Sequence, residues 1–198
     1  MHLSLGTYVI DFKGTRFVED IYASNYSLSG AKNTIYYKRA EAYNTLVINP
    51  SNEGEQYMDG IATVTRYGTS DNTAFGIMDM SKAYNAGDAT VLHAERGMML
   101  TENRRRVIIQ DEVQLDKNSE VYWFANAATD VRIASDGKSA ILEQDGERYC
   151  IALLACGWPN NKTYKWSDTK KLMQYGIEEY IYRELGEAED LLDLPDRV

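Results

Sequence analysis

Apolar and polar residues alternate with a period of two along most of the first 155 residues, and this pattern constrains the fold more than any other feature. Successive side chains of a β-strand point to opposite faces, so the alternation is typical of strands with one buried face. The alternating segments are short, and turn residues rather than helical segments separate them. The sequence therefore predicts an all-β protein, a large antiparallel β-sandwich rather than a parallel α/β sheet.

The turn residues between these segments predict where the chain reverses direction. Lys13-Gly14, Asp136-Gly137 and Asp145-Gly146 each place a glycine where a tight hairpin turn needs a positive φ. The predicted strands are residues 7–12, 16–19, 43–49, 60–67, 75–80, 89–99, 104–113, 121–125, 131–135, 139–143 and 148–154.

The last 40 residues follow a different pattern. The apolar residues of 170–185 fit a helical face imperfectly and a closing strand at 177–185 about as well. We expect the strand, with one short C-terminal helix as the alternative. Acidic residues crowd 186–198 and Pro195 would interrupt a helix there. The predicted organisation is one sandwich domain over residues 1–185 and an acidic C-terminal tail over 186–198.

The net charge of −9, from 21 Lys and Arg against 30 Asp and Glu, limits the partners that we expect. A field of this sign repels phosphate backbones and anionic lipid headgroups, so we expect neither nucleic acid nor a membrane as a partner. An anionic sugar polymer would need a local basic or metal-bearing groove. No apolar run reaches the roughly 18 to 20 residues that span a bilayer, and the first residues lack the features of a signal peptide.

Reactive side chains are few and carry no local catalytic motif. His2 and His93 are the two histidines, and neither accompanies a GxSxG elbow. The sequence contains no GxxxxGK[ST], GxGxxG, CxxC pair or HExxH, so phosphate loops, dinucleotide folds and local zinc motifs have no support. Cys150 and Cys156 lie in an apolar stretch, where we expect buried free thiols and take a disulfide as the alternative.

One spaced set of residues remains: His2 ahead of the first strand, Asp20 after the second, and the run from Tyr36 to Pro50. The first two strands are antiparallel, so residues near the start of one lie close to residues near the end of the other. An imidazole and a carboxylate could then share one cation. The alternative is that His2 is a frayed terminal residue.

Several segments resemble, in order, the C-terminal β-sheet domain of heparinase II/III-like polysaccharide lyases. The resemblance extends over roughly residues 2–155 and rests on HLSLGTYVIDFKGTRFVED, YYKRAEAYNTLVINP, RRVIIQDEV, VYWFANAATDVRI and DGKSAIL. In that family an N-terminal helical toroid packs on the β-sandwich. The cleft between them cleaves uronic-acid polysaccharides by β-elimination. The resemblance therefore implies a sandwich that forms one wall of such a cleft.

The resemblance also implies a metal site. The first family motif reads approximately H-x-H-[NL]-D-x-G-[ST]-[FY], and His2 and Gly6 fall on its second His and its Gly. By this correspondence His2 is the first ligand of a zinc or similar divalent ion, and Asp20 is the second. The third would precede Asn44, where the motif R-x-E-[GA]-H-N-T-L has a histidine and this chain has Tyr43.

Departures from the family pattern weaken this implied site. The first motif histidine, implicated in proton transfer, would precede Met1, and its partner tyrosine belongs to the helical domain, so we assign no catalytic residue to this chain. A phenol is protonated at neutral pH and binds zinc poorly, which leaves one imidazole and one carboxylate for a metal that prefers about four donors. The alternative to Zn²⁺ is a hydrogen-bonded cluster of His2, Asp20 and Tyr43.

Arg39, Tyr37 and Asn44 are the candidate substrate-binding residues. A guanidinium makes a forked pair of charge-assisted bonds to a uronate carboxylate, and a tyrosine covers the apolar side of a sugar. The alternative is an exposed sheet face of long and aromatic side chains. Asp111 and Glu112 do not form an acid/base pair in our interpretation, because neighbours on a strand point to opposite faces.

The sequence thus predicts the C-terminal sandwich of a heparinase II/III-like polysaccharide lyase, inactive by itself, with a uronic-acid polysaccharide and an N-terminal helical toroid as partners. The alternative is a non-catalytic β-sandwich that binds carbohydrate or a protein. An apolar face left exposed where a helical domain would pack would favour a homodimer. The resemblance implies a bacterial protein that is periplasmic, secreted or cytoplasmic, and the sequence does not decide among these.

Overall fold

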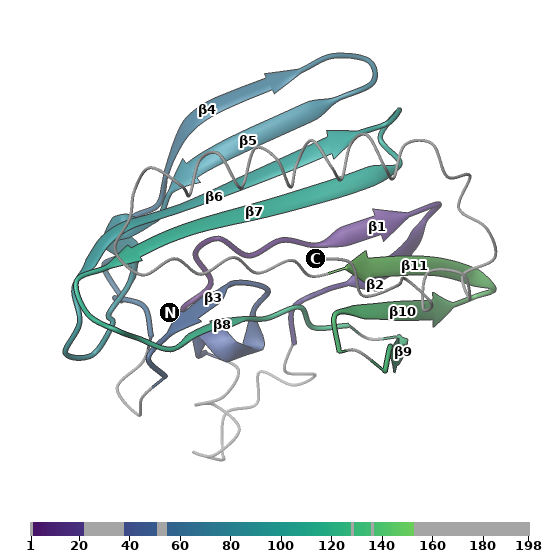
Figure 1. The fold of residues 1–198 in the computed structure, drawn as a ribbon. Coiled ribbons are helices and arrows are strands. Elements are labelled where there is room, and N and C mark those ends of the chain that lie inside the picture. Colours follow the sequence, from purple (N-terminus) through teal and green to yellow (C-terminus); the bar gives the residue numbers. More distant parts are fainter. Residues whose placement is uncertain (1, 22–37, 51–54, 128, 136, 153–198) are drawn as a thin grey trace. The chain divides into compact units, whose positions relative to one another are not determined.

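The computed structural model describes residues 2–21, 38–50, 55–127, 129–135 and 137–152 (Figure 1). These residues belong to two compact units, 1–128 and 129–198. Every pair of neighbouring strands in the described residues is antiparallel, and the described helical elements are short 3-10 turns. The predicted all-β fold class is confirmed. None of the described helices has the length and apolar character needed to cross a membrane.

A four-stranded antiparallel sheet is the largest element of the first unit (Figure 1). It consists of β4 (Thr63–Thr69), β5 (Ala74–Asp79), β6 (Val91–Thr101) and β7 (Arg106–Leu115), in that order. Each strand pairs with the next along the chain, as expected when short connections join alternating segments. Along β6 the buried residues Ala94 and Arg96 lie two positions apart, so the two-residue period holds.

The turn between β6 and β7 lies two residues later than the sequence predicts. Strands were expected at 89–99 and 104–113, whereas β6 ends at Thr101 and β7 begins at Arg106. Glu102, Asn103 and Arg104 have φ angles of 51°, 55° and 63°, a left-handed conformation that ends one strand before the next begins. The Arg104 side chain donates hydrogen bonds to backbone oxygens of the loop before β5, which holds the turn in place.

The described residues of the first unit also form two short strand pairs. The hairpin of β1 (Ile10–Phe12) and β2 (Thr15–Val18) turns at Lys13 and Gly14, which have φ angles of 51° and 84°, as predicted. Strand β3 (Leu46–Ile48) pairs with β8 (Val121–Trp123), a contact between distant parts of the sequence.

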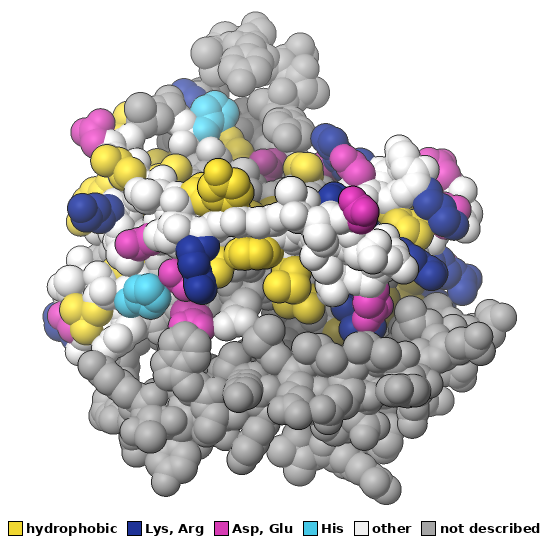
Figure 2. Space-filling model, turned by 90° about the horizontal axis from the view of Figure 1, so that it is seen from above, with side chains coloured by type: hydrophobic (Ala, Val, Ile, Leu, Met, Phe, Trp, Pro, Cys, Tyr) yellow, Lys and Arg dark blue, Asp and Glu magenta, His cyan; other side chains and the backbone are white. Residues whose placement is uncertain are grey.

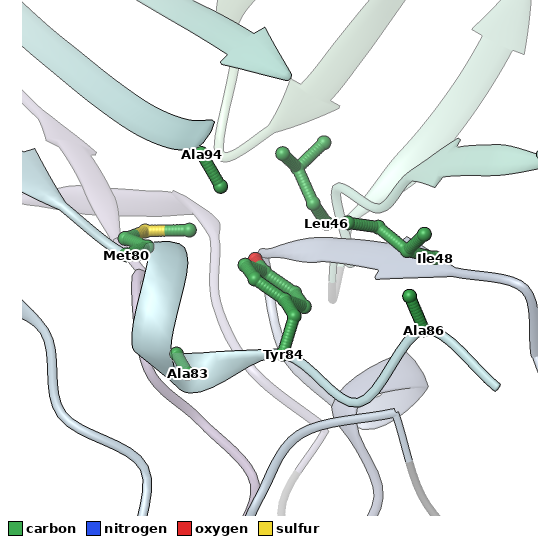
Figure 3. Packing of buried hydrophobic residues seen from close by; sticks show 7 residues of the cluster. All are labelled: Leu46, Ile48, Met80, Ala83, Tyr84, Ala86 and Ala94. Carbon is green, nitrogen blue, oxygen red and sulfur yellow. The ribbon is translucent and has the colours of Figure 1, made fainter. Parts of the chain in front are cut away.

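The hydrophobic core of the first unit lies between β3, β6 and the segment that follows β5 (Figure 3). That segment contains the 3-10 turn η2 (Ser81–Ala83). The Tyr84 ring lies beneath Leu46 and Ile48 of β3, and Met80 faces Ala94 of β6. The cluster consists of buried residues Leu46, Ile48, Met80, Ala83, Tyr84, Ala86 and Ala94. Burial of these side chains fixes β3, and therefore the residues just before it.

The second unit contains a three-stranded sheet of β9 (Asp130–Ile133), β10 (Ser139–Gln144) and β11 (Glu147–Ala152), with β10 in the middle. The β10–β11 hairpin turns at Asp145 and Gly146, with φ angles of 54° and 78°, as predicted. Cys150 was expected to be buried but is exposed and free, because the alternation along β11 places it on the outward face with Arg148.

The remaining sequence predictions at this level are not decided by the described residues. The single domain over residues 1–185 stays a prediction. Cys156, the closing strand or helix within 170–185 and the acidic tail at 186–198 lie outside the described residues.

Candidate functional site

The N-terminal segment lies beside β3 and the residues before it (Figure 1). The Leu3 N–H donates to the Lys38 carbonyl at 2.9 Å, and the Thr45 hydroxyl donates to the Leu5 carbonyl at 2.8 Å. The Gln56 side-chain amide both accepts from the Leu5 N–H and donates to the Leu5 carbonyl, each at 3.0 Å. These bonds hold the segment against the residues on either side of β3 and place His2 beside the loop at residues 43–44.

His2 and Tyr43 are in direct contact. A hydrogen bond joins His2 Nδ1 and the Tyr43 hydroxyl, and the two rings meet edge to face with centroids 5.9 Å apart. Tyr43 follows the 3-10 turn η1 (Ala40–Ala42) and donates its N–H to the Ala40 carbonyl at 3.0 Å, which aims its ring at the N-terminal segment. Tyr43 is buried, whereas His2 is exposed. The structure therefore brings together two of the three residues at the implied ligand positions.

Asp20, the third of these residues, is buried just after β2. Its Oδ1 accepts a hydrogen bond from the Thr7 hydroxyl and another, of 3.0 Å, from the Asn44 N–H. Hydrogen bonds of this kind satisfy a carboxylate that burial would otherwise destabilise. The Asp20 carboxylate is thus held against the residue that follows Tyr43.

Asn44 is fully buried and joins three segments of the first unit. Its side-chain NH₂ donates to the Tyr8 carbonyl at 2.9 Å, and its side-chain oxygen accepts from the Asn126 N–H at 2.5 Å. Both ends of the amide are therefore used within the chain. Asn44 was a candidate for contact with substrate, and that role stays a prediction; in this structure its amide holds parts of the first unit together.

Arg96, on β6, is the central cation of this region, and the sequence analysis missed it. Its side chain is fully buried and forms a two-pronged ion pair with Asp111 on β7, at 2.6 and 2.7 Å. Its Nη1 also donates to the Gly6 and Asn44 carbonyls at 2.6 and 2.8 Å, and its guanidinium lies 5.5 Å from the centre of the Tyr8 ring. The alternation along β6 was a usable signal, because Arg96 shares the buried face with Ala94.

Arg39 forms a second charged cluster with Glu41 and Glu55. It donates two hydrogen bonds to the Glu41 carboxylate at 2.8 and 3.1 Å and forms an ion pair with Glu55. Arg39 was expected to bind a uronate carboxylate. In this structure its guanidinium binds two carboxylates of the chain, with which a uronate would compete, and the substrate-binding role stays a prediction. Tyr37, its proposed partner, lies outside the described residues.

Burial raises the pKa of Glu55 above its ordinary value, and the neighbouring Glu41 carboxylate raises it further, against the opposing effect of Arg39. The folded chain therefore binds the Glu55 proton more tightly than the unfolded chain does. Stability then falls as the pH rises from the ordinary glutamate range through the raised pKa.

A Glu55→Gln variant tests this pH dependence, because glutamine cannot ionise but keeps an oxygen for Arg39. We expect its free energy of unfolding, relative to the parent, to increase between about pH 5 and about pH 8 in urea titrations. Glu120→Gln, at an exposed position, controls for the loss of one negative charge. A Glu55→Gln difference that stays constant over this range would contradict the assignment.

The residues at the implied metal position do not fit a zinc site. The part of the chain that the structure describes contains no group of three or more His, Cys, Asp or Glu residues placed to hold a metal ion. His2 Nδ1 is bonded to the Tyr43 hydroxyl, and one Asp20 oxygen accepts two hydrogen bonds. A zinc ion prefers about four donors, and an imidazole with a single carboxylate falls short of that number.

The surface of the first unit also carries an open apolar groove of about 280 Å³. Tyr8 and Ile10 line one side, and Phe75, Met98 and Ile109 of the large sheet lie opposite. The described residues that line the groove carry no charge, so they are not suited to bind a uronate. Figure 2 shows both signs of charge interspersed with hydrophobic side chains on the face in view.

Comparison with known proteins shows a similarity of fold to a solved structure. No protein-family model matches the chain, and no curated protein matches it. The fold is similar to that of the heparan sulfate lyase HepC from Pedobacter heparinus, with a TM-score of 0.59 and 15% sequence identity. The similarity covers 79% of this chain and 24% of the lyase chain, so this chain spans about a quarter of that protein. At this identity the likeness shows a distantly shared fold.

Proposed function

We propose that this chain is the C-terminal β-sandwich of a heparinase II/III-like polysaccharide lyase and forms one wall of a cleft for a uronic-acid polysaccharide. One observation carries the proposal: on a fold shared with a heparan sulfate lyase, the two motif segments of the resemblance meet at a single site. His2 and Thr7 come from the first segment, and Tyr43 and Asn44 come from the second. In this proposal the helical toroid that forms the other wall is the partner domain.

By itself the chain should not cleave its substrate. β-Elimination removes the proton next to a uronate carboxylate and expels the 4-linked sugar, which requires a base, an acid and a group that neutralises the carboxylate. Among the described residues of the site, His2 is exposed, and its imidazole could move a proton. In this proposal the buried Asn44 and Arg96 hold the wall in shape, and Arg39, whose side chain is 20% exposed, is the cation that contacts the substrate.

The proposal is tested with heparan sulfate, chondroitin sulfate and alginate oligosaccharides. We expect no unsaturated uronide, measured as a rise in ultraviolet absorbance. We expect calorimetry to show binding that weakens with salt. Arg39→Gln should weaken it about tenfold or more, because a charge-assisted bond contributes roughly 1.5–3 kcal/mol. Arg106→Gln, at an ion pair with Glu102 in the β6–β7 turn of the first unit, is the matched control and should bind as the parent does. Cleavage by this chain, or equal binding by both variants, would contradict the proposal.

A second function, a non-catalytic module that binds neutral sugars or a protein, is supported by a different observation. On and next to the edge strand β4, the large side chains Ile61, Val64 and Tyr67 are 61%, 60% and 83% exposed. Exposed apolar groups on a sheet edge are typical of an interaction surface. Binding of neutral glycans, or a dimer in light scattering that Tyr67→Ser disrupts, would favour this second function.

A further inference from the structure

Two of the three residues at the implied metal-ligand positions contact each other directly. Tyr43 reaches His2 directly, so a hydrogen bond joins the residues at the first and third ligand positions that the resemblance implies. Asp20 accepts its bonds from Thr7 and from the backbone of Asn44, the residue after Tyr43. All three of these positions therefore have partners within the first unit.

We propose that Tyr43 replaces a bound metal ion: its hydroxyl ties the N-terminal segment to the residues before β3, and replacing it with histidine creates a transition-metal site. The inference rests on the same site as the proposed function, but not on polysaccharide binding. Its tests use the metal alone, so either hypothesis can fail without the other.

A histidine side chain is shorter than a tyrosine side chain, and this difference is the reason that Tyr43→His would leave room for a metal ion. From a common Cβ, an imidazole Nε2 extends about 2 Å less far than a phenol oxygen, by standard covalent geometry. Where the Tyr43 oxygen now contacts His2 Nδ1, an imidazole would therefore leave a gap of about 2 Å. Added to the present contact distance, that gap separates the two nitrogens by roughly two Zn–N bonds of about 2.0–2.1 Å each, so an ion could bridge the two rings. Asp20 beside the loop would supply a third donor, and water a fourth, as in zinc sites with three protein ligands.

The first experiment measures Zn²⁺ content after equilibration and gel filtration. We expect less than about 0.1 zinc per chain in the parent and about one in Tyr43→His. Tyr43→Phe is the matched control, because it removes the hydroxyl without adding a donor, and it should take up no zinc. Adding Asp20→Asn to Tyr43→His should weaken zinc binding by more than the roughly 10- to 100-fold that loss of an outer partner costs. A parent that holds one zinc, or a folded Tyr43→His variant that holds none, would overturn the proposal.

A second experiment remains decisive if Tyr43→His does not fold. If the His2–Tyr43 hydrogen bond holds the N-terminal segment to the residues before β3, His2→Ala and Tyr43→Phe should each lower the thermal midpoint of unfolding. The double variant should lower the midpoint no further than the more damaging single substitution does. A metal chelator should leave the parent's midpoint unchanged. Additive effects of the two substitutions, or a midpoint that falls with chelator, would overturn the proposal.

Discussion

Arg96→Met is expected to lower the free energy of unfolding by about 3–5 kcal/mol, the largest effect of any single substitution that we propose. Arg96 is fully buried and binds the Asp111 carboxylate through two hydrogen bonds, so its removal leaves a mostly buried charge without compensation. The Gly6 and Asn44 carbonyls lose their donor at the same time. Methionine fills much of the same space, so the loss reports the ion pair rather than a large cavity.

Urea denaturation of the parent and of Arg96→Met measures this loss directly. Arg16→Met is the matched control, because Arg16 makes a similar two-bond ion pair with Asp11 on the surface, where both side chains are about half exposed. Solvent screens such a pair, so the control should unfold at nearly the same urea concentration as the parent. A combined Arg96→Met and Asp111→Leu variant should recover part of the loss, because no charge then remains buried. A small change in the free energy of unfolding of Arg96→Met would contradict this prediction, because it would mean that water solvates the Asp111 carboxylate once Arg96 is removed.

Gly6→Ala is expected to cost about 2–5 kcal/mol, the second largest effect. Gly6 has a φ of +84°, and a Cβ there would lie 2.5 Å from Met80 Sδ and 3.1 Å from Thr45 Oγ1. The left-handed backbone accounts for about 1–2 kcal/mol of the cost. The rest arises because Met80 is fully buried in the core and must move to admit the methyl group.

Gly14→Ala separates these two contributions. Gly14 has the same φ of +84°, but nothing lies within 4 Å of the position that a Cβ would take. This variant should therefore cost only the backbone part, about 1–2 kcal/mol. The difference between the two variants, measured by urea denaturation, gives the packing cost at Gly6. Equal costs would contradict tight packing of the N-terminal segment on Met80.

The strands and several turns could be predicted from the sequence because their causes are local. Alternation predicted the strands of the first 152 residues to within a few residues at most ends, and Lys13-Gly14 and Asp145-Gly146 turn where a glycine permits a positive φ. The errors have local causes as well. Three successive non-glycine residues, from Glu102 to Arg104, adopt a positive φ in the β6–β7 turn, and side-chain alternation carries no signal for such a turn.

The candidate site was only partly predictable. The resemblance placed His2, Asp20 and Tyr43 in one region, and the structure joins His2 to Tyr43 and sets Asp20 beside the next residue. Whether any of them serves a substrate or a metal stays a prediction. The partners of Arg39, by contrast, were not foreseen, because Glu55 reaches it across a loop of the chain.

The sequence by itself determined the all-β class and its hairpins, since the period of two and the turn residues act over a few neighbouring positions. Only the tertiary structure decided what the buried polar groups do. Arg96 binds the Gly6 carbonyl 90 positions away, and Asn44 accepts a bond from Asn126 82 positions away. Burial requires each such group to find a partner, but which partner it finds depends on how distant segments pack.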